Sequence, residues 1–246
     1  MSPNSRSVTA LPIRAYATDR LIAADRLVPI PDAIDDQTAA AILLKGLTAY
    51  YLLFQTWPLA AGETILWHAA AGGTGLIAAQ WAKALGATVI GTAGSDDKTA
   101  LAKAHGCDHV INYATEDFAA RVRELTDGRG VDVVYDGVGK ATFDKSLDCL
   151  RPRGLMVSFG NASGVVTIPD VTVLARKGSL YVTRPTGTHY LGQRAALLEG
   201  ASRLFQAVQS GAIKVQVNQS YALSDVAAAH RALEGRHTTG SVVLVP

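Results

Sequence analysis

The sequence predicts an α/β fold built on a doubly wound, parallel sheet, and three observations support this prediction. The apolar run at residues 64–68 stops at small residues and a glycine turn, and an amphipathic segment opens directly after it. Further β-branched runs then alternate with helical segments at a steady spacing. Residues 131–135 are rich in valine, which is typical of a strand buried on both faces of a parallel sheet.

Strands and crossover helices follow one another along the chain. The expected strands are residues 64–68, 87–93, 109–112, 131–135, 154–159 and 180–183, and the expected helices are 76–85, 96–105, 116–126 and 141–150. Right-handed crossovers arrange these strands most simply in the order 3-2-1-4-5-6. The ligand crevice of such a sheet lies at the carboxyl ends of its strands, where Gly72, Ser95, Tyr113, Gly137 and Asn161 all fall.

The turn after the first strand has the spacing Ala69-x-x-Gly72-x-x-Gly75, with alanine where the common dinucleotide fingerprint has its first glycine. A dinucleotide diphosphate needs such a junction, because bare backbone must approach the phosphates and a helix N-terminus must offer unpaired N–H groups. A tight strand-to-helix turn that binds no ligand would have the same pattern. The turn therefore indicates a nucleotide site without establishing one.

The end of the second strand favours NADPH over NADH as the dinucleotide. An NAD site usually places an acid there to hold the ribose 2′-hydroxyl, whereas here no carboxylate comes before Asp96. Small residues leave room for a 2′-phosphate, Ser95 can donate a hydrogen bond and Lys98 supplies a point charge. Taken singly, Ser95 could instead be a helix N-cap and Lys98 a solvated side chain.

Composition limits the class of protein. The chain has 246 residues, 48% of them hydrophobic, which fits a buried α/β core, and its net charge of +2 gives no footprint for nucleic acid or an anionic membrane. No apolar run looks long enough for a membrane span, and the first residues lack the features of a signal peptide. Cys107 and Cys149 lie far apart on expected helical segments, so neither a disulfide framework nor a zinc cluster is indicated. We expect a cytoplasmic protein.

Four segments of the chain resemble one enzyme family. They are residues 44–53 (LKGLTAYYLL), 68–73 (HAAAGG), 157–164 (VSFGNASG) and 234–240 (EGRHTTG). They resemble the NADPH-dependent quinone oxidoreductases, the zeta-crystallin-like, zinc-independent branch of the medium-chain dehydrogenase/reductase superfamily. The resemblance runs from about residue 15 to the C-terminus and implies a Rossmann domain that follows a remnant of a GroES-like β domain.

The resemblance also implies a set of cofactor-binding residues. It places the diphosphate at the turn of Ala71, Gly72, Gly73, Thr74 and Gly75; the 2′-phosphate against Ser95, Lys98, Tyr113 and Arg236; and the ribose and nicotinamide against Gly137, Val138, Gly139, Phe159, Gly160 and Asn161, with Thr48 near the nicotinamide ring. By themselves, Tyr113 would be a strand-end aromatic side chain and Arg236 a solvated cation at a helix end.

The resemblance implies an enzyme that reduces quinones without a metal. The six histidines form no zinc-ligand pattern with the cysteines, and a quinone needs no Lewis acid because its reduction is strongly favourable. Water can protonate the hydroquinone product. Proximity of quinone and nicotinamide therefore carries the catalysis, and no residue is assigned as a proton donor.

We expect three parts: a remnant of the GroES-like domain (1–44), the Rossmann domain (45–210) and a C-terminal segment that returns to the substrate-domain side (211–246). Since most of the GroES-like domain is missing, the C-terminal pieces should expose apolar surface, and a non-catalytic NADPH-binding protein stays an alternative. A related enoyl-type reductase is a weaker alternative. The apolar run 180–183 ends the sheet, so pairing of this edge in a homodimer is expected.

Overall fold

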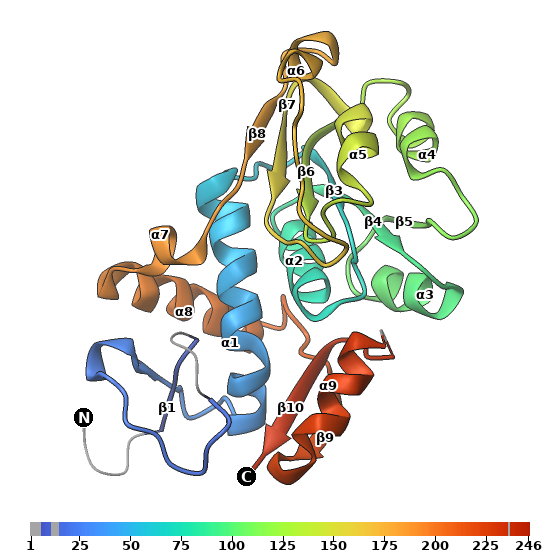
Figure 1. The fold of residues 1–246 in the computed structure, drawn as a ribbon. Coiled ribbons are helices and arrows are strands. Elements are labelled where there is room, and N and C mark those ends of the chain that lie inside the picture. Colours follow the sequence, from blue (N-terminus) through green and yellow to red (C-terminus); the bar gives the residue numbers. More distant parts are fainter. Residues whose placement is uncertain (1–5, 11–14, 236) are drawn as a thin grey trace.

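A six-stranded parallel sheet forms the centre of the fold (Figure 1). The computed structural model describes residues 6–10, 15–235 and 237–246. The sheet has the order β5-β4-β3-β6-β7-β8, with strands β3 (Thr64–Trp67), β4 (Thr88–Ala93), β5 (His109–Asn112), β6 (Val131–Asp136), β7 (Leu150–Ser158) and β8 (Tyr181–Thr183). This is the order 3-2-1-4-5-6, so the predicted doubly wound sheet is confirmed.

Helices cover both faces of this sheet. They are α1 (Asp36–Tyr51), α2 (Gly73–Ala84), α3 (Asp96–Ala104), α4 (Phe118–Leu125), α5 (Phe143–Cys149), α6 (Thr172–Arg176), α7 (Gly187–Leu191) and α8 (Arg194–Gln209). Side chains of α1, α2 and α8 share one buried cluster with one face of the sheet, and side chains of α4 and α5 share a second cluster with the other face. Along β3, Ile65 and Trp67 enter the first cluster and Leu66 the second, which explains the unbroken apolar runs.

The two longest helices, α1 and α8, were not expected from the sequence, nor were the short helices α6 and α7. Helix α1 continues through the π-helical turn η2 (Leu52–Thr56), and together they form a 21-residue helix that is long and apolar enough to cross a membrane. The helix reaches that length although Lys45 interrupts its apolar run, because its overall composition is apolar. Of its most apolar stretch of 18 residues, 61% is buried inside the protein, and the helix packs against α2 and α8 as a core helix does. The other long helix, α8, buries Leu197, Ala201 and Leu204 at helical spacing.

A small unit at the C-terminus lies below the sheet in Figure 1. It consists of the parallel strands β9 (Val217–Ala222) and β10 (Ser241–Val245), the turn η3 (Leu223–Asp225) and helix α9 (Val226–Glu234). Ser241 Oγ donates to the Ala41 carbonyl on α1, 3.0 Å away, which fixes this unit to the core helix.

The described N-terminal residues lie beside that unit (Figure 1). Strands β1 (Ser7–Val8) and β2 (Val28–Pro29) pair antiparallel, and the short helix η1 (Ala24–Arg26) precedes β2. The Tyr16 hydroxyl lies 3.0 Å from His230 Nε2 of α9. The expected boundary between residues 44 and 45 falls within α1, and the division into three parts stays a prediction.

The two cysteines are buried at separate places. Cys107 lies in the turn after α3 and not on a helix, because that helix already ends at Ala104; Cys149 is the last residue of α5. Burial raises the pKa of both thiols to about 12. Neither thiol is therefore ionised near neutral pH.

Candidate dinucleotide site

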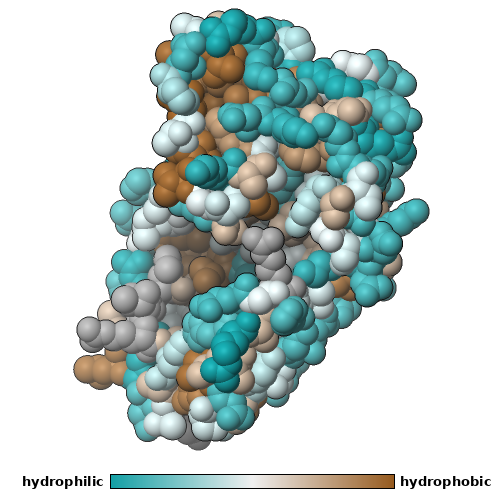
Figure 2. Space-filling model, turned by 45° about the vertical axis from the view of Figure 1, so that its right-hand side comes forward, coloured by the Kyte–Doolittle hydropathy of each residue, from teal (hydrophilic) through white to brown (hydrophobic). Residues whose placement is uncertain are grey.

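A crevice of about 500 Å³ opens at the carboxyl ends of β3, β4 and β6. Its walls come from the glycine turn, the ends of β4 and β5, the loops after β6 and β7, and the C-terminal unit. The lining residues include Ala71, Gly72, Thr92, Gly94, Lys98, Tyr113, Glu116, Val138, Thr142, Lys145, Leu233 and Thr238. The molecular surface in Figure 2 is hollowed between the upper and lower parts of the molecule.

The turn between β3 and α2 leaves its amide groups available. Ala69 adopts the left-handed conformation, with φ of 54°, at the position where the common fingerprint has glycine. The Gly72 amide donates to the Ala69 carbonyl at 2.9 Å, and Gly72 is the N-cap of α2 but offers no side chain to cap the helix. The first amides of α2 therefore face the crevice, as an anion site requires.

The three glycines of the turn have different surroundings. A Cβ on Gly75 would lie 2.6 Å from the Ala69 and Ala70 carbonyl oxygens, so this glycine permits the close contact of helix and strand. A Cβ on Gly72 would meet only the Ala69 oxygen, at 3.2 Å, and would otherwise project into the crevice. On Gly73 it would meet the side chain of Lys45 and the carbonyl of Gly240.

The predicted adenosine end of the crevice brings together two of the predicted phosphate ligands. Lys98 of α3 and Tyr113, directly after β5, both line it. Ser95 occupies the N-cap position of α3, is exposed and makes no capping hydrogen bond, and it does not line the crevice. Asp96, the first acid after β4, accepts a hydrogen bond from Asn112 Nδ2 at 2.8 Å. Arg236 lies outside the described residues.

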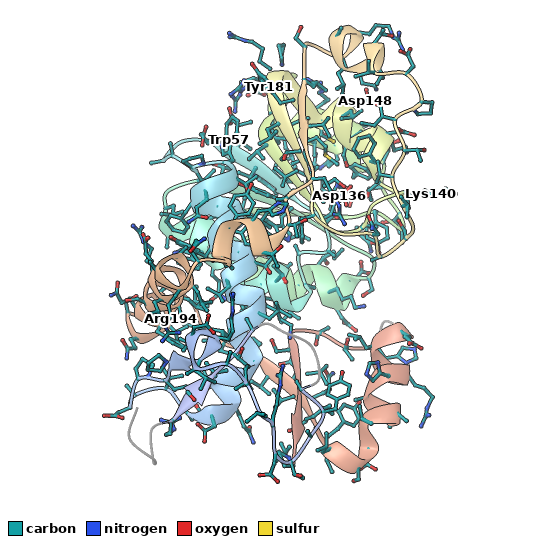
Figure 3. All side chains as sticks on the ribbon, turned by 60° about the vertical axis from the view of Figure 1, so that its left-hand side comes forward. Trp57, Asp136, Lys140, Asp148, Tyr181 and Arg194 are labelled. Atoms are coloured by element: carbon teal, nitrogen blue, oxygen red, sulfur yellow. The ribbon has the colours of Figure 1, made fainter. Side chains whose placement is uncertain are left out.

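A layer of buried polar side chains supports the floor of the crevice. Asp136, at the end of β6, is fully buried and accepts hydrogen bonds from the amides of Val138 (2.7 Å) and Gly139 (3.0 Å) and from Thr142 Oγ1 (2.7 Å). Figure 3 shows Asp136 in the interior, whereas Lys140 of the same loop lies at the outside. Asp136 thereby fixes the turn that places Val138 in the crevice.

His68 connects this layer to the adenosine end. Its Nδ1 lies 2.9 Å from Thr92 Oγ1 on β4 and its Nε2 lies 2.8 Å from Ser146 Oγ on α5. Burial lowers the pKa of His68 to about 4, and Asp136 opposes that shift. The ring is therefore neutral near pH 7. His68 connects β4 and α5 through hydrogen bonds and carries no charge there.

The loop after β7 forms the predicted nicotinamide end. A Cβ on Gly160 would lie 2.3 Å from the Gly137 carbonyl oxygen, so these two loops touch through bare backbone. The Phe159 ring packs on Trp67 with centroids 5.5 Å apart. The amide of Asn161, turned to satisfy its neighbours, accepts from Arg184 Nη2 at 3.3 Å.

Thr48 lies in a separate apolar cavity of about 260 Å³, between α1, α7 and α8. Leu44, Leu47, Tyr51, Leu191 and Leu197 line it together with Thr186. Arg184 connects this cavity to the loop after β7, because it bonds Asn161 and the Ser158 carbonyl and lies near the Tyr51 hydroxyl. The structure thus places Thr48 beside the predicted nicotinamide end but outside the main crevice.

Several lining residues were not predicted from the sequence. Glu116 and Lys145 face the crevice from the segments at α4 and α5, and Thr238 and Leu233 reach it from the C-terminal unit. The loop after β5 was identified as part of the crevice edge, so Glu116 could have been found from it. The contribution of the C-terminal unit depends on how it docks, and no local pattern encodes that.

Comparison with known proteins identifies the class. The profile of the zinc-binding dehydrogenase family matches residues 73–198, and the chain belongs to this family of oxidoreductases. Quinone oxidoreductase from Pseudomonas aeruginosa is 53% identical over 235 residues, which are 96% of this chain and 72% of that protein. The 2-haloacrylate reductase of a Burkholderia species is 49% identical, with the same two coverages.

A solved structure gives the same result in three dimensions. The Escherichia coli quinone oxidoreductase complexed with NADPH superimposes with a TM-score of 0.92 at 51% identity, over 94% of this chain and 72% of that one. The chain is therefore a member of the quinone oxidoreductase group of the family, and it is an enzyme. The family predicted from the four sequence segments is confirmed.

Proposed function

We propose that this protein reduces quinones with NADPH and does so without zinc. The observation that carries the proposal is the crevice at the switch point of the sheet, where Gly72 at the start of α2, Lys98 and Tyr113 line the same space. The related enzyme with NADPH bound supports the same cofactor here. When bound, NADPH supplies the hydride.

Each part of the crevice has a task in this proposal. The bare turn at Gly72 receives the diphosphate, since its missing Cβ leaves the amides of α2 accessible. Lys98 and Tyr113 hold the 2′-phosphate, Lys98 with a charge and Tyr113 with a hydroxyl that donates. Asp136 keeps the Val138 loop in the position that receives the ribose.

The cavity beside Thr48 suits a flat, apolar hydride acceptor. Four leucines and Tyr51 give it apolar walls that can orient a ring by shape, and three threonines and Arg26 add polar groups. Because Arg184 connects it to Asn161, an acceptor there would lie next to the predicted nicotinamide end. Holding the two partners in contact is then the main contribution of the protein to the rate.

Zinc independence rests on the donor set. Within residues 6–10, 15–235 and 237–246, no three histidine, cysteine or acidic side chains gather closely enough to hold a metal ion. Zinc sites of dehydrogenases need such a group with an open position. The carbonyls of a quinone need no metal to accept a hydride.

An absorbance assay tests this function. Purified protein is mixed with NADPH and 1,4-benzoquinone, and the absorbance of the reduced nicotinamide is followed, with a parallel reaction that contains 2-chloroacrylate. The 2-haloacrylate reductase relative makes the second acceptor the specific alternative. Oxidation with the quinone alone supports the proposal, oxidation with 2-chloroacrylate alone favours the alternative, and tight binding of NADPH without oxidation indicates a non-catalytic role.

A further inference from the structure

Lys45 lies at the glycine turn, although it belongs to α1 and the rest of that helix and strand β3 separate it from the turn in the sequence. A Cβ on Gly73 would lie 2.6 Å from Lys45 Cδ and 2.7 Å from Cε. The end of the lysine side chain therefore passes directly over the first residue of α2. Only glycine at residue 73 leaves room for it, since any side chain there would displace the lysine.

The ammonium group of Lys45 has no counter-charge within the described part of the chain. It forms no hydrogen bond and no ion pair with any residue that the structure describes. The side chain is partly buried, and this burial lowers its pKa. A partly buried ammonium without a counter-charge is unfavourable, and a ligand whose negative charge lay beside the glycine turn would compensate for it.

The space around Lys45 is continuous with the main crevice. A second cavity, of about 520 Å³, is lined by Lys45, Gly72 and Gly73 together with residues of the C-terminal unit. It shares Gly72, Leu233 and Thr238 with the crevice that holds Lys98 and Tyr113. A ligand that extends from the adenosine end across Gly72 therefore passes the end of the lysine side chain.

From this geometry we infer that Lys45 binds the diphosphate of the dinucleotide, in concert with the amides at the start of α2. The inference rests on the proposed dinucleotide function and adds a residue to it. Lys45 and Lys98 then have different tasks. Lys98 recognises the 2′-phosphate, which only NADPH carries, whereas Lys45 recognises a group that NADPH, NADH and ADP-ribose all share.

Calorimetric titration of variants tests this division. Lys45→Met keeps the length and packing of the side chain over Gly73 but removes the charge. It should weaken NADPH, NADH and ADP-ribose by a similar factor of roughly ten or more, the range for a lost hydrogen bond to a charged group. Lys45→Arg, which keeps a cation, should restore most of the affinity and thereby shows that the charge is responsible.

The matched control is Lys83→Met at the other end of α2, where the lysine pairs with Asp108 on the surface. It removes the same charge and should leave all three affinities unchanged. The inference is overturned if Lys45→Met binds all three ligands as the wild type does, or if it loses NADPH and NADH but keeps ADP-ribose, since the ammonium would then contact the nicotinamide half. If the wild type itself binds none of them, the proposed function fails instead.

Discussion

The phenol of Tyr113 lies on the bare backbone of Gly94: a Cβ on that glycine would come within 2.5 Å of the Tyr113 hydroxyl oxygen. Gly94 follows β4 and Tyr113 follows β5, so the contact joins the tips of two neighbouring strands at the predicted adenosine end of the crevice. The position of the phenol therefore depends on a residue that has no side chain.

Gly94→Ala should displace Tyr113 without unfolding the protein. The clashing atoms are the far end of a half-exposed side chain, which can turn outward at little cost to stability. We expect NADPH to bind about as weakly as it does to Tyr113→Ala, while NADH is less affected. Titration calorimetry of both variants, with thermal unfolding as the folding control, checks this. Full NADPH affinity in Gly94→Ala would show that Tyr113 only lines the crevice and does not bind the 2′-phosphate.

Lys98→Ala should weaken NADPH roughly tenfold or more and leave NADH nearly unchanged, because only NADPH carries the 2′-phosphate. Lys98 lines the crevice beside Tyr113, and the first acid after β4 is held by Asn112. Calorimetric titration with both cofactors measures the ratio. An equal loss for both would refute the assignment of Lys98 to the 2′-phosphate.

Gly72 and Gly75 should respond differently to an added side chain. Gly72→Val projects into the crevice and should abolish binding of both cofactors, while circular dichroism still reports a folded protein. Gly75→Ala drives a methyl group into two carbonyl oxygens and should cost about 1–3 kcal/mol of stability, as overpacking does. Chemical denaturation separates the two cases. Wild-type affinity in Gly72→Val would mean that this turn binds no diphosphate.

The neutral state of His68 should make stability depend on pH. Its pKa is about 4 in the folded protein and near 6.5 when exposed, so between these values the unfolded chain takes up a proton that the folded chain refuses. The contribution of neutral His68 to the free energy of unfolding is present in full above pH ~6.5. It falls as the pH drops to about 4, by a total of about 3 kcal/mol. Urea unfolding at several pH values measures the slope. His68→Asn should be less stable at every pH, but its free energy of unfolding should depend less on pH across this window. An unchanged slope would show that other groups cause the pH dependence.

The edge of the sheet provides a test of association. Strand β8 is the last in the sheet, and Tyr181 on it is 59% exposed; Figure 3 shows it at the outer edge. An apolar edge strand can pair with a second copy about a two-fold axis. We expect a homodimer by light scattering at micromolar concentration and a monomer for Tyr181→Asp. A monomeric wild type would exclude edge pairing as a stable interface.

The sheet could be predicted closely because each strand is a short apolar run bounded by turn residues. The valine-rich run of β6 and the glycine turn after β3 identified two of the strands. The rules for right-handed crossovers then determined the order of the strands in the sheet. Helix α8 was missed although Leu197, Ala201 and Leu204 have helical spacing. Helix α1 was missed because Lys45 stands in its apolar run, where a charge argues against a buried helix.

The candidate site was predictable only as far as it follows the strands. Gly72, Lys98, Tyr113 and Val138 come directly after strand ends, and the structure brings them to one crevice. Lys45 and Thr238 belong to segments that reach the turn only through tertiary packing, so no spacing in the sequence relates them to it. Ser95 follows a strand as well, but it is exposed and does not line the crevice.

Gly72 and Gly240 form an isolated parallel β-bridge that joins the glycine turn to the C-terminal unit. The Gly240 amide donates a hydrogen bond to the Ala71 carbonyl at 3.3 Å. A dinucleotide over Gly72 would touch both partners of this pair. Binding of the dinucleotide and docking of the C-terminal unit are then thermodynamically linked. Any interaction that holds the C-terminal unit in place raises the affinity for the dinucleotide, and the bound dinucleotide in turn stabilises the contact between these two distant segments of the chain. Resistance of the segment 211–240 to protease should therefore rise with the fraction of protein that is occupied.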